Sequence, residues 1–310
     1  MEKISVLMST YREPLEWIEQ SLNSIIKQTY TDIEYIIIVD DPMNSELISY
    51  LQKYNQNNPR IKLLINPQNM GLVKSLNRGL QYCSGEYIAR MDADDISYPE
   101  RLEKQLVYMQ KYRYDIVGCD YEVFFQDTVI KTSNSPALHE SCKKTLRYES
   151  CIAHPSWLVR AKVYDQLNGY REIDACEDLD FLQRAIIQGF TMGNCKEVLL
   201  KYRDNPNSIS HMKTAKQRAI AKRLSKSYRN GTILSDSDYQ QFLQSKSFEK
   251  SCQIETKILK NEGIIKASAN SYSIWKRGIA YISLCTCMRY IIRKMNRRKV
   301  RKWKREENEN

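Results

Sequence analysis

The sequence predicts an α/β fold, with an open, mostly parallel sheet flanked by helices and a helical C-terminal extension. Up to Lys111, apolar runs of strand length alternate with stretches whose apolar residues recur at helical spacing. The apolar runs are continuous, which is typical of strands buried on both faces of a parallel sheet. From about His211 onward the pattern is helical and polar, so we place a domain boundary near residue 212.

Four strands and four helices are expected to alternate in the first part of the chain. The strands are predicted at residues 4–8, 35–39, 61–65 and 87–91. The helices are predicted to begin at Pro14, after Ser45 as N-cap, at Gly71 and at Pro99. This order favours a parallel sheet, in which ligands bind beyond the carboxyl ends of the strands.

The segment from Asp115 to about Tyr202 has a more mixed pattern. Short strands are expected at residues 116–119, 123–125, 158–160 and 198–202, and helices at residues 138–148 and 179–188. A chain of 310 residues with 42% hydrophobic content is long enough for one large domain with an appendage. Its nine cysteines are scattered without a Cys-x-x-Cys pair, which favours reduced thiols in a cytosolic compartment.

Three polar clusters follow predicted strands, where such a sheet would gather them. They are Ser9-Thr10-Tyr11, Asp40-Asp41 and Asp92-Ala93-Asp94-Asp95. Grouped carboxylates repel one another unless a cation or a donor-rich ligand lies among them. Because Mg²⁺ binds one or two carboxylates together with substrate phosphates, an Asp-x-Asp at the mouth of the sheet fits a nucleotide diphosphate. The alternative is an Asp-rich turn that only caps the helix at Pro99.

A further acidic pair, Glu177-Asp178, begins a predicted helix. The helix dipole stabilises acidic residues in a first turn, and that effect alone is one interpretation. The other is a general base for an acceptor hydroxyl, which needs a carboxylate directed into the site.

These motifs, ordered over residues 1–205, resemble those of glycosyltransferase family 2, whose members have the GT-A fold. The resemblance rests on Ser9-Thr10-Tyr11, Gln28-Thr29, Ile38-Val39-Asp40-Asp41, Asn69-Met70-Gly71-Leu72, Asn77-Arg78-Gly79, the run from Gly85 to Asp95, and Glu177-Asp178. It implies a catalytic domain at residues 1–212 and a helical region at residues 213–310. Residues 1–95 would form the nucleotide-binding half of that domain and residues 96–212 the acceptor half.

The resemblance also implies a metal-dependent, inverting transfer from a UDP-sugar held with Mn²⁺ or Mg²⁺. The donor would be contacted by Ser9, Thr10, Tyr11, Asp40, Asp41, Lys74, Asp92 and Ala93. Asp94 would ligate the metal, with Asp92 beside it. Apart from the resemblance, His211 is a candidate to approach the metal or the diphosphate when its loop closes. Asp178 would be the catalytic base with Glu177 beside it, and Asp95 would only start the helix that follows.

Two positions depart from the family pattern. Arg12-Glu13 stands where Asn-Arg or Asn-Glu is usual, and Pro42-Met43 follows Asp41 where Gly-Ser is usual.

The other histidines and two aromatic residues are assigned mainly to structure. We expect a structural role for His154, with acceptor or phosphate contact as the alternative, and we expect His139 at the surface. Core packing is favoured over sugar stacking for Trp157 and Tyr202.

The net charge of +11 is concentrated near the C-terminus. Ten Lys/Arg and no Asp/Glu lie between Arg289 and Arg305, and the chain without these ten charges carries +1. Apolar residues from Tyr281 to Trp303 interleave with them at helical spacing, which predicts a basic amphipathic stretch on anionic lipid rather than on nucleic acid. A solvated tail, or one packed on a partner helix, is the alternative.

The expected location is cytoplasmic, peripheral on the inner face of a bacterial membrane. The first strand pattern begins at Ile4 without a secretory leader, and no apolar run of membrane-spanning length occurs. In this setting, the acceptor is expected to be a growing, lipid-linked surface polysaccharide of the capsule or O-antigen type.

Three other functions share features with this sequence. A nucleotidyltransferase also needs an Asp-bound metal, but it usually carries an early Gly-rich phosphate loop, and none follows Met8. A nicotinamide oxidoreductase is disfavoured because G-x-G-x-x-G is absent. A catalytically inactive sugar-binding or scaffold subunit is the non-enzymatic alternative, and the intact Asp92, Asp94 and Asp178 count against it.

Overall fold

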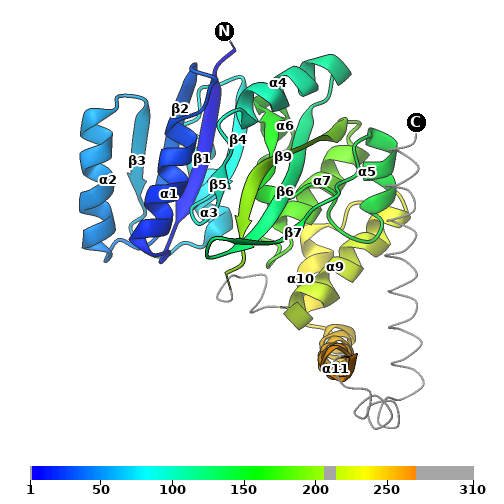
Figure 1. The fold of residues 1–310 in the computed structure, drawn as a ribbon. Helices are drawn as coiled ribbons and strands as arrows, with labels where there is room; N and C mark the ends of the chain where they lie inside the picture. The colour runs from blue at the N-terminus through cyan, green and yellow to red at the C-terminus, as the bar shows by residue number, and fades with distance from the viewer. Residues whose placement is uncertain (1, 206–213, 270–310) are drawn as a thin grey trace. The chain divides into compact units, whose positions relative to one another are not determined.

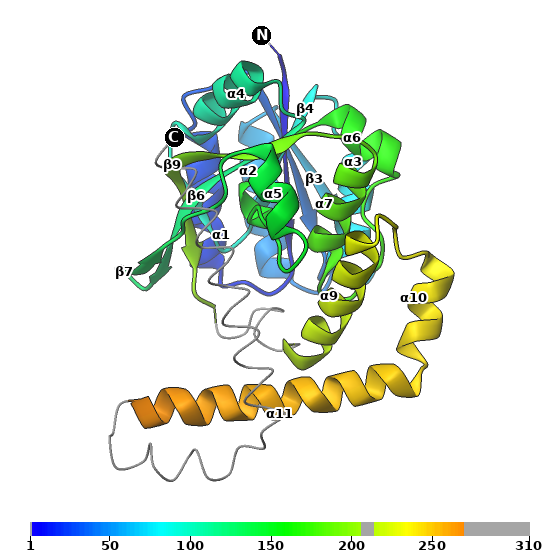
Figure 2. The same cartoon turned by 90° about the vertical axis from the view of Figure 1, so that its right-hand side faces the viewer.

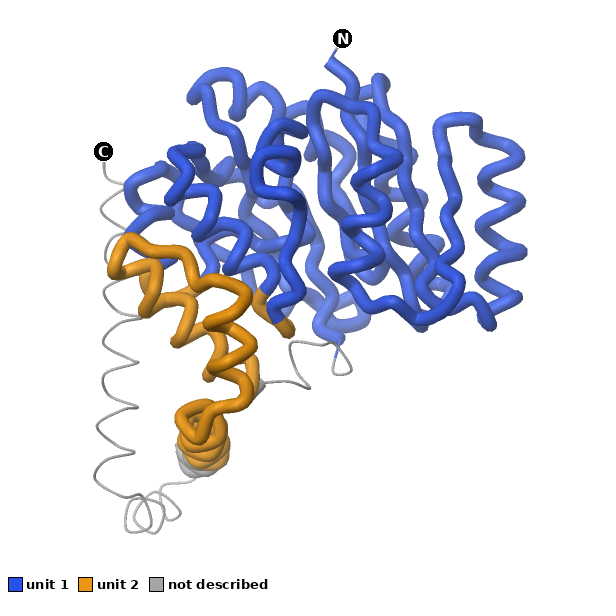
Figure 3. Tube along the Cα trace, turned by 180° about the vertical axis from the view of Figure 1, so that it is seen from behind, with its two compact units in different colours: residues 1–146, 150–173, 177–205 blue, residues 147–149, 174–176, 206–310 orange. Residues whose placement is uncertain are grey.

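The computed structural model describes residues 2–205 and 214–269. The chain divides into two compact units (Figure 3). The first comprises residues 1–146, 150–173 and 177–205, and the second comprises residues 147–149, 174–176 and 206–310. The boundary predicted near residue 212 falls outside the described residues and stays a prediction.

The first unit contains a nine-stranded sheet flanked by helices (Figure 1), which confirms the predicted α/β class. The strands are β1 (Ile4–Thr10), β2 (Ile33–Val39), β3 (Ile61–Ile65), β4 (Tyr87–Asp92), β5 (Ile96–Ser97), β6 (Ile116–Phe125), β7 (Thr128–Thr132), β8 (Leu158–Arg160) and β9 (Met192–Arg203). The helices are α1 (Leu15–Ile26), α2 (Ser45–Asn57), α3 (Leu72–Leu80), α4 (Arg101–Tyr112), α5 (His139–Thr145), the short 3₁₀ helix η1 (His154–Ser156), α6 (Ala161–Leu167) and α7 (Glu177–Ile187).

The sheet is parallel in its first half and mixed in its second. Its order is β3-β2-β1-β4-β8-β6-β9-β5, with β7 paired to β6. Strands β3, β2, β1 and β4 pair in parallel, whereas β8 runs antiparallel to both of its neighbours, β4 and β6. The helical crossovers that force parallel pairing in the first half are therefore not repeated throughout the second.

Several element boundaries differ from the predictions. The strands expected at 116–119 and 123–125 form one strand, β6, and the strand expected at 198–202 already begins at Met192. Strands β5 and β7 and helix α6 were not predicted. Strand β7 is exposed along its whole length, so it carries no apolar face for a pattern to reveal. At α2 the N-cap is Asn44, whose side chain accepts from Leu47 N at 3.1 Å, and not Ser45.

Helices cover both faces of the sheet, with α1 and α4 on one side and α3, α6 and α7 on the other (Figure 2). Ile18, Leu22 and Ile25 of α1 are fully buried in the core of the first face. Each is worth about 1.5–3 kcal/mol of burial, so packing holds this helix in place. On the other face α3 approaches closely: a Cβ at Gly79 would lie 2.4 Å from Leu7 Cδ1.

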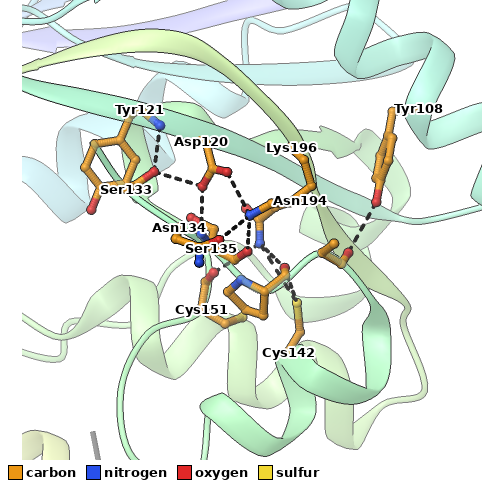
Figure 4. Close-up of polar contacts among 12 residues, drawn as sticks. Tyr108, Asp120, Tyr121, Ser133, Asn134, Ser135, Cys142, Cys151, Asn194 and Lys196 are labelled. Carbon is orange, nitrogen blue, oxygen red and sulfur yellow. Dashed lines mark hydrogen bonds and ion pairs between the residues drawn. The ribbon is translucent and has the colours of Figure 1, made fainter. Parts of the chain in front are cut away.

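A buried polar network pins the segment after β7 against β6 and β9 (Figure 4). The Asp120 carboxylate accepts hydrogen bonds from Ser133 Oγ at 2.9 Å and from Ser135 N at 2.6 Å, and it pairs with Lys196 Nζ at 2.8 Å. Asn194 Nδ2 donates to two backbone carbonyls nearby. A polar residue can therefore stand within β6, and this is why the apolar pattern appeared to break there.

A second buried carboxylate, Glu34 of β2, ties the N-terminal strands together. Its Oε1 accepts from Ser5 Oγ and from Ser84 N, both at 2.6 Å, and its Oε2 pairs with Lys62 Nζ at 3.0 Å. Burial alone would raise the pKa of Glu34, but the hydrogen bonds from Ser5 and Ser84 and the Lys62 ammonium outweigh it and lower the pKa to about 2.

Glu34→Gln is therefore expected to lower the free energy of unfolding at pH 7 by about 2–3 kcal/mol. The folded pKa lies below the ordinary value of 4.5, so the stabilisation is complete above that pH and is lost as the pH falls toward 2. Urea unfolding of the wild type and of Glu34→Gln at pH 7 and pH 3 measures this difference in the free energy of unfolding. A stability difference that does not shrink at pH 3 would contradict this assignment.

The described part of the second unit is helical, with α9 (Thr214–Arg229), α10 (Asp236–Leu243) and α11 (Lys246–Ala269). Helix α9 buries Ile220 and Leu224, and its Lys222 ammonium pairs with the buried Glu255 carboxylate of α11. Among the helices of the described residues, none combines the length and apolarity needed to cross a membrane.

Candidate active site

The parallel register brings the predicted polar clusters to one edge of the sheet. Ser9 lies beside Asp92 of β4, and Thr10 lies beside Val39, the last residue of β2. Asp40 and Asp41 follow Val39 directly. The carboxyl ends of β1, β2 and β4 therefore gather the residues that the sequence assigned to one site.

The acidic run after β4 is crowded. Asp92, Asp94 and Asp95 each offer a carboxylate oxygen, and these three atoms lie within 4.8 Å of one another. The crowding comes from a tight turn, in which Asp95 N donates to the Asp92 carbonyl at 3.4 Å. Ser21 Oγ of α1 donates to the same carbonyl at 3.0 Å. Burial and then the charge of Asp92 raise the pKa of Asp94 to about 6, and the same two causes raise the pKa of Asp95.

Asp95 is more than the start of a helix, so that prediction is wrong. Strand β5 separates it from α4, and its buried Oδ1 accepts a hydrogen bond from Arg203 N at 2.8 Å. Its Oδ2 has no partner among the described residues. Ala93 is also buried, so the contact with the sugar donor predicted for this position would have to come from its backbone peptide group.

This cluster fits a hard divalent cation. Three mutually repelling carboxylates and one unpartnered buried carboxylate oxygen are the groups that such an ion would satisfy. Oxygen ligands of this kind suit Mg²⁺ and Mn²⁺. Asp94 is held in place by Asn205 Nδ2, which donates to its Oδ2 at 3.2 Å.

Two arginines that the sequence reasoning left without a role lie against the acidic run. Arg90, 1% exposed, pairs with Asp92. Arg203, at the end of β9, donates from Nε to the Asp94 carbonyl at 2.7 Å. Arg90 could have been found from its position two residues before Asp92, because alternate strand residues share a face. No sequence signal marks Arg203, since its position depends on the pairing of β9 with β5.

The unusual Arg12-Glu13 closes the loop after β1. Glu13 Oε2 accepts from Thr10 Oγ1 at 2.7 Å and from Tyr11 N at 2.8 Å. Arg12 Nε donates to Asp41 Oδ2 at 3.1 Å, and its guanidinium lies 4.8 Å from the centre of the Tyr11 ring. Tyr11, Arg12 and Asp41 therefore form a polar and aromatic surface beside the acidic run.

Asp40 is a positioning group rather than an open ligand. It is 3% exposed, and it accepts from Asn66 Nδ2 and Met70 N at 2.7 Å and from Gly71 N at 2.8 Å. Gly71 has a φ of 82°, a conformation that a side chain would strain, and it begins α3. Asp41 is also engaged, but at the protein surface side of the loop: its Oδ1 accepts from Met43 N and its Oδ2 from the exposed Arg12, both at 3.1 Å.

Lys74 of α3 reaches toward the segment before α7. Its Nζ lies 3.5 Å from Glu172 Oε2, and the two side chains are 50% and 66% exposed. An ion pair this exposed contributes at most about 1 kcal/mol, so an anionic ligand can compete for the ammonium.

Glu177 and Asp178 are the first two residues of α7, and the pKa of each carboxyl is raised. Burial and then the Asp178 charge raise the pKa of Glu177 to about 7, with Asp92 adding to the shift and Arg90 opposing it. Burial also raises the pKa of Asp178, against hydrogen bonds from Leu179 N and the Ser150 side chain. Among these groups, the charge of Asp92 therefore acts on Glu177.

His154 lies in a buried aromatic cluster, as its structural interpretation predicted. Its Nε2 lies 2.9 Å from the Tyr170 hydroxyl, and its ring packs edge-on against Trp157, 4.6 Å between centroids. Burial, followed by the charge of Arg90, holds the pKa of His154 well below its ordinary value, so the ring is neutral. Trp157 is fully buried, which confirms its core packing.

The remaining predictions concern His139, Tyr202 and His211. His139 is half-buried and its Nδ1 accepts from Met192 N at 3.2 Å, so the surface prediction is wrong. Tyr202 is half-buried, with its ring centre 5.8 Å from that of Tyr121. His211 lies outside the described residues.

Two relatives share the sequence over most of the chain. An uncharacterised glycosyltransferase of Methanocaldococcus jannaschii, MJ1057, is 33% identical over 224 residues, which cover 69% of this chain and 75% of the relative. The O-antigen biosynthesis glycosyltransferase WbnJ of Escherichia coli is 31% identical over 225 residues, which cover 71% of this chain and 85% of WbnJ.

Two solved structures share the fold at low identity. Residues 1–349 of Staphylococcus aureus TarS, in complex with UDP-GlcNAc, match with a TM-score of 0.61 and 17% identity, over 89% of this chain and 79% of that one. The mannosyltransferase PcManGT of Pyrobaculum calidifontis, with GDP-Man and Mn²⁺, matches with a TM-score of 0.58 and 13% identity, over 98% of this chain and 83% of that one.

The family profile described as glycosyl transferase family 2 matches residues 5–167. That span covers β1 to α6 and the acidic run, and it ends before Glu177. With more than half of the chain matched and relatives above 30% identity, the chain belongs to glycosyl transferase family 2 and has the GT-A fold.

Proposed function

We propose that this chain transfers a sugar from a UDP-sugar to an acceptor hydroxyl, with inversion at the anomeric carbon. The observation that carries the proposal is the acidic cluster of Asp92, Asp94 and Asp95 within 4.8 Å, and the charge of Asp92 also contributes to the raised pKa of Glu177. Sugar transfer needs charge neutralisation at the leaving group and a carboxylate base at the attacking hydroxyl. The UDP-GlcNAc in TarS and the GDP-Man with Mn²⁺ in PcManGT support a nucleotide-sugar donor on this fold.

The nucleoside part of the donor would lie on the surface formed by Tyr11, Arg12 and Asp41. Thr10 and Asp40 hold the loops that shape this surface, because both side chains are already engaged in hydrogen bonds. The diphosphate would draw Lys74 away from its exposed pair with Glu172.

On the metal side, Asp94 would hold Mn²⁺ or Mg²⁺ with Asp92 beside it. When bound, the ion supplies charge neutralisation for the departing diphosphate. A role for His211 as a further ligand is part of the proposal and rests on the sequence alone.

At the acceptor, Asp178 would accept the proton of the hydroxyl as its oxygen attacks the anomeric carbon from the face opposite the diphosphate. The neighbouring Glu177 carboxylate keeps the pair basic through mutual repulsion.

A panel of nucleotide-sugars incubated with Mn²⁺ tests the proposed function. We expect metal-dependent release of UDP from at least one UDP-sugar. Release from GDP-sugars alone would keep the transferase and overturn the donor class. Binding without release from any sugar nucleotide would favour the scaffold alternative, and formation of a sugar nucleotide from a nucleoside triphosphate would favour the nucleotidyltransferase.

We further propose a lipid-linked polysaccharide acceptor and a peripheral position on the inner face of the membrane. The O-antigen name of WbnJ supports the polysaccharide. The basic amphipathic stretch between Tyr281 and Trp303, outside the described residues, supports the membrane position. The full chain is expected to float with anionic vesicles, whereas a chain ending at Ser271 is not. Equal flotation of both would contradict this position.

A further inference from the structure

The side chain of Arg203 lies in a stack between two aromatic rings. Its guanidinium carbon is 4.8 Å from the centre of the Trp17 ring and 4.5 Å from that of the Phe124 ring. Its Nη2 donates to Gln20 Oε1 at 2.6 Å. Because these partners come from α1 and β6, elements far apart in the sequence fix the position and the plane of the guanidinium.

Arg203 bonds the acidic run through two different groups. Its Nε donates to the carbonyl oxygen of Asp94 at 2.7 Å, and its backbone N donates to Asp95 Oδ1 at 2.8 Å. Two residues further on, Asn205 Nδ2 donates to Asp94 Oδ2 at 3.2 Å. The end of β9 and the residues after it therefore hold both the main chain and the side chains of the run.

The bond to the carbonyl matters because the turn that forms the run is weakly closed by its own peptides. Its internal hydrogen bond, from Asp95 N to the Asp92 carbonyl, is long at 3.4 Å, and the three carboxylates repel one another. A guanidinium bonded to the Asp94 carbonyl resists opening of the turn and does not occupy the place of a cation at the Asp94 carboxylate.

We propose that Arg203 is a positioning residue, which holds the turn from Asp92 to Asp95 closed so that the Asp94 carboxylate is in place for a divalent cation. The inference rests on the proposed function, since it concerns the same metal site. In this assignment Arg203 acts through its bonds to Asp94 and Asp95, and the stack against Trp17 keeps it in position.

The sign of the effect on cation binding separates positioning from electrostatic repulsion. As a positive charge, the guanidinium repels a divalent cation, so loss of charge alone would tighten Mn²⁺ binding. Loss of the clamp on the turn weakens Mn²⁺ binding, although a repelling charge has gone. Arg203→Lys keeps the charge but not the planar stack between two rings, so it distinguishes the two effects a second time.

Arg160 is a matched control in the same unit. Its Nε donates to the Tyr114 carbonyl at 3.2 Å, and its guanidinium carbon lies 5.3 Å from the centre of the Tyr87 ring. It therefore resembles Arg203 in bonding a backbone carbonyl while it stacks on an aromatic ring. Arg160 lies opposite Tyr87, the first residue of β4, whereas the acidic run begins at the last residue, Asp92.

The test is a titration of the full-length protein with Mn²⁺ in the absence of donor, with free Mn²⁺ measured by electron paramagnetic resonance and folding checked by circular dichroism. Arg203→Met is expected to weaken Mn²⁺ binding by about 10- to 100-fold and Arg203→Lys by about tenfold. Arg160→Met should bind Mn²⁺ as the wild type does.

Trp17→Leu carries the test if Arg203→Met does not fold. It removes one ring of the stack, and it is expected to weaken Mn²⁺ binding about threefold in the wild type and no further in Arg203→Lys. An equal loss in both backgrounds would contradict the role of the stack.

Mn²⁺ binding by Arg203→Met that is as tight as that of the wild type, or tighter, would overturn the inference. Wild-type binding by Arg203→Lys would do the same, and so would an equal loss in Arg160→Met. A wild type that binds no Mn²⁺ overturns the metal assignment and this inference together. A wild type that binds Mn²⁺ through Arg203 but releases UDP from no UDP-sugar overturns the proposed transfer alone.

Discussion

Asp94→Asn is expected to lower kcat/KM for sugar transfer by about 1,000-fold while the fold is retained. The amide has nearly the same shape, and its oxygen can still accept the hydrogen bond that Asn205 donates. What is lost is the negative charge that would hold the divalent cation at the diphosphate. Rates of UDP release at saturating and limiting Mn²⁺ measure the effect.

The same substitution is expected to stabilise the protein in the absence of metal. Burial and the charge of Asp92 raise the pKa of Asp94 to about 6 from an ordinary 3.8, so at pH 7 the ionised carboxylate costs up to about 3 kcal/mol of stability. This cost is absent below pH 3.8, grows as the pH rises, and is complete above pH 6. Thermal unfolding in a chelator should therefore give a higher Tm for Asp94→Asn than for the wild type.

Asp165→Asn provides the control for both measurements. Asp165 is an exposed aspartate on α6, which follows β8 where that strand pairs with Tyr87, at the end of β4 opposite to Asp92. The Asp165→Asn substitution should change neither the turnover of the enzyme nor the response of its Tm to Mn²⁺. The metal assignment would be abandoned if Asp94→Asn kept its activity, or if Mn²⁺ raised the Tm of Asp94→Asn as much as that of the wild type.

Asp178→Asn is expected to lower kcat by about 100- to 10,000-fold with little change in the donor KM. The asparagine can keep the hydrogen bonds at the start of α7, including the one from Ser150, but it cannot take the proton of the acceptor hydroxyl. Donor binding should survive, because the acidic run is unchanged. Initial rates with varied donor and acceptor separate the two effects.

Glu177→Gln is the matched variant at the adjacent position. It should cost less in kcat than Asp178→Asn, and it should shift the acid limb of the pH–rate profile to lower pH, because it removes the group whose pKa, raised to about 7 by burial and by the Asp178 charge, sets the last ionisation of the pair. If Glu177→Gln were the more damaging change, the base would be Glu177 and not Asp178.

The sequence determined the first half of the fold in detail. A continuous apolar run such as residues 35–39 is removed from water when the strand is buried on both faces. Apolar residues at helical spacing, such as Ile18, Leu22 and Ile25, are removed from water when one face of the helix is buried. The polar residues that follow those strands must then meet at one edge. The acidic run and its neighbours were therefore predictable as a cluster from local patterns alone.

The tertiary structure alone decided how deeply each of those residues is buried and which groups it bonds. Asp40 looked equivalent to Asp41 in the sequence, yet the loop before α3 turns back and satisfies Asp40 with three donors. Arg203 reaches the acidic run only because β9 pairs with β5. The coupling of Asp92 to Glu177 likewise arises from the packing of α7 and not from the short motifs themselves. Local patterns set which face of an element is buried, whereas distances between elements depend on long-range packing, and the chemistry of this site depends on those distances.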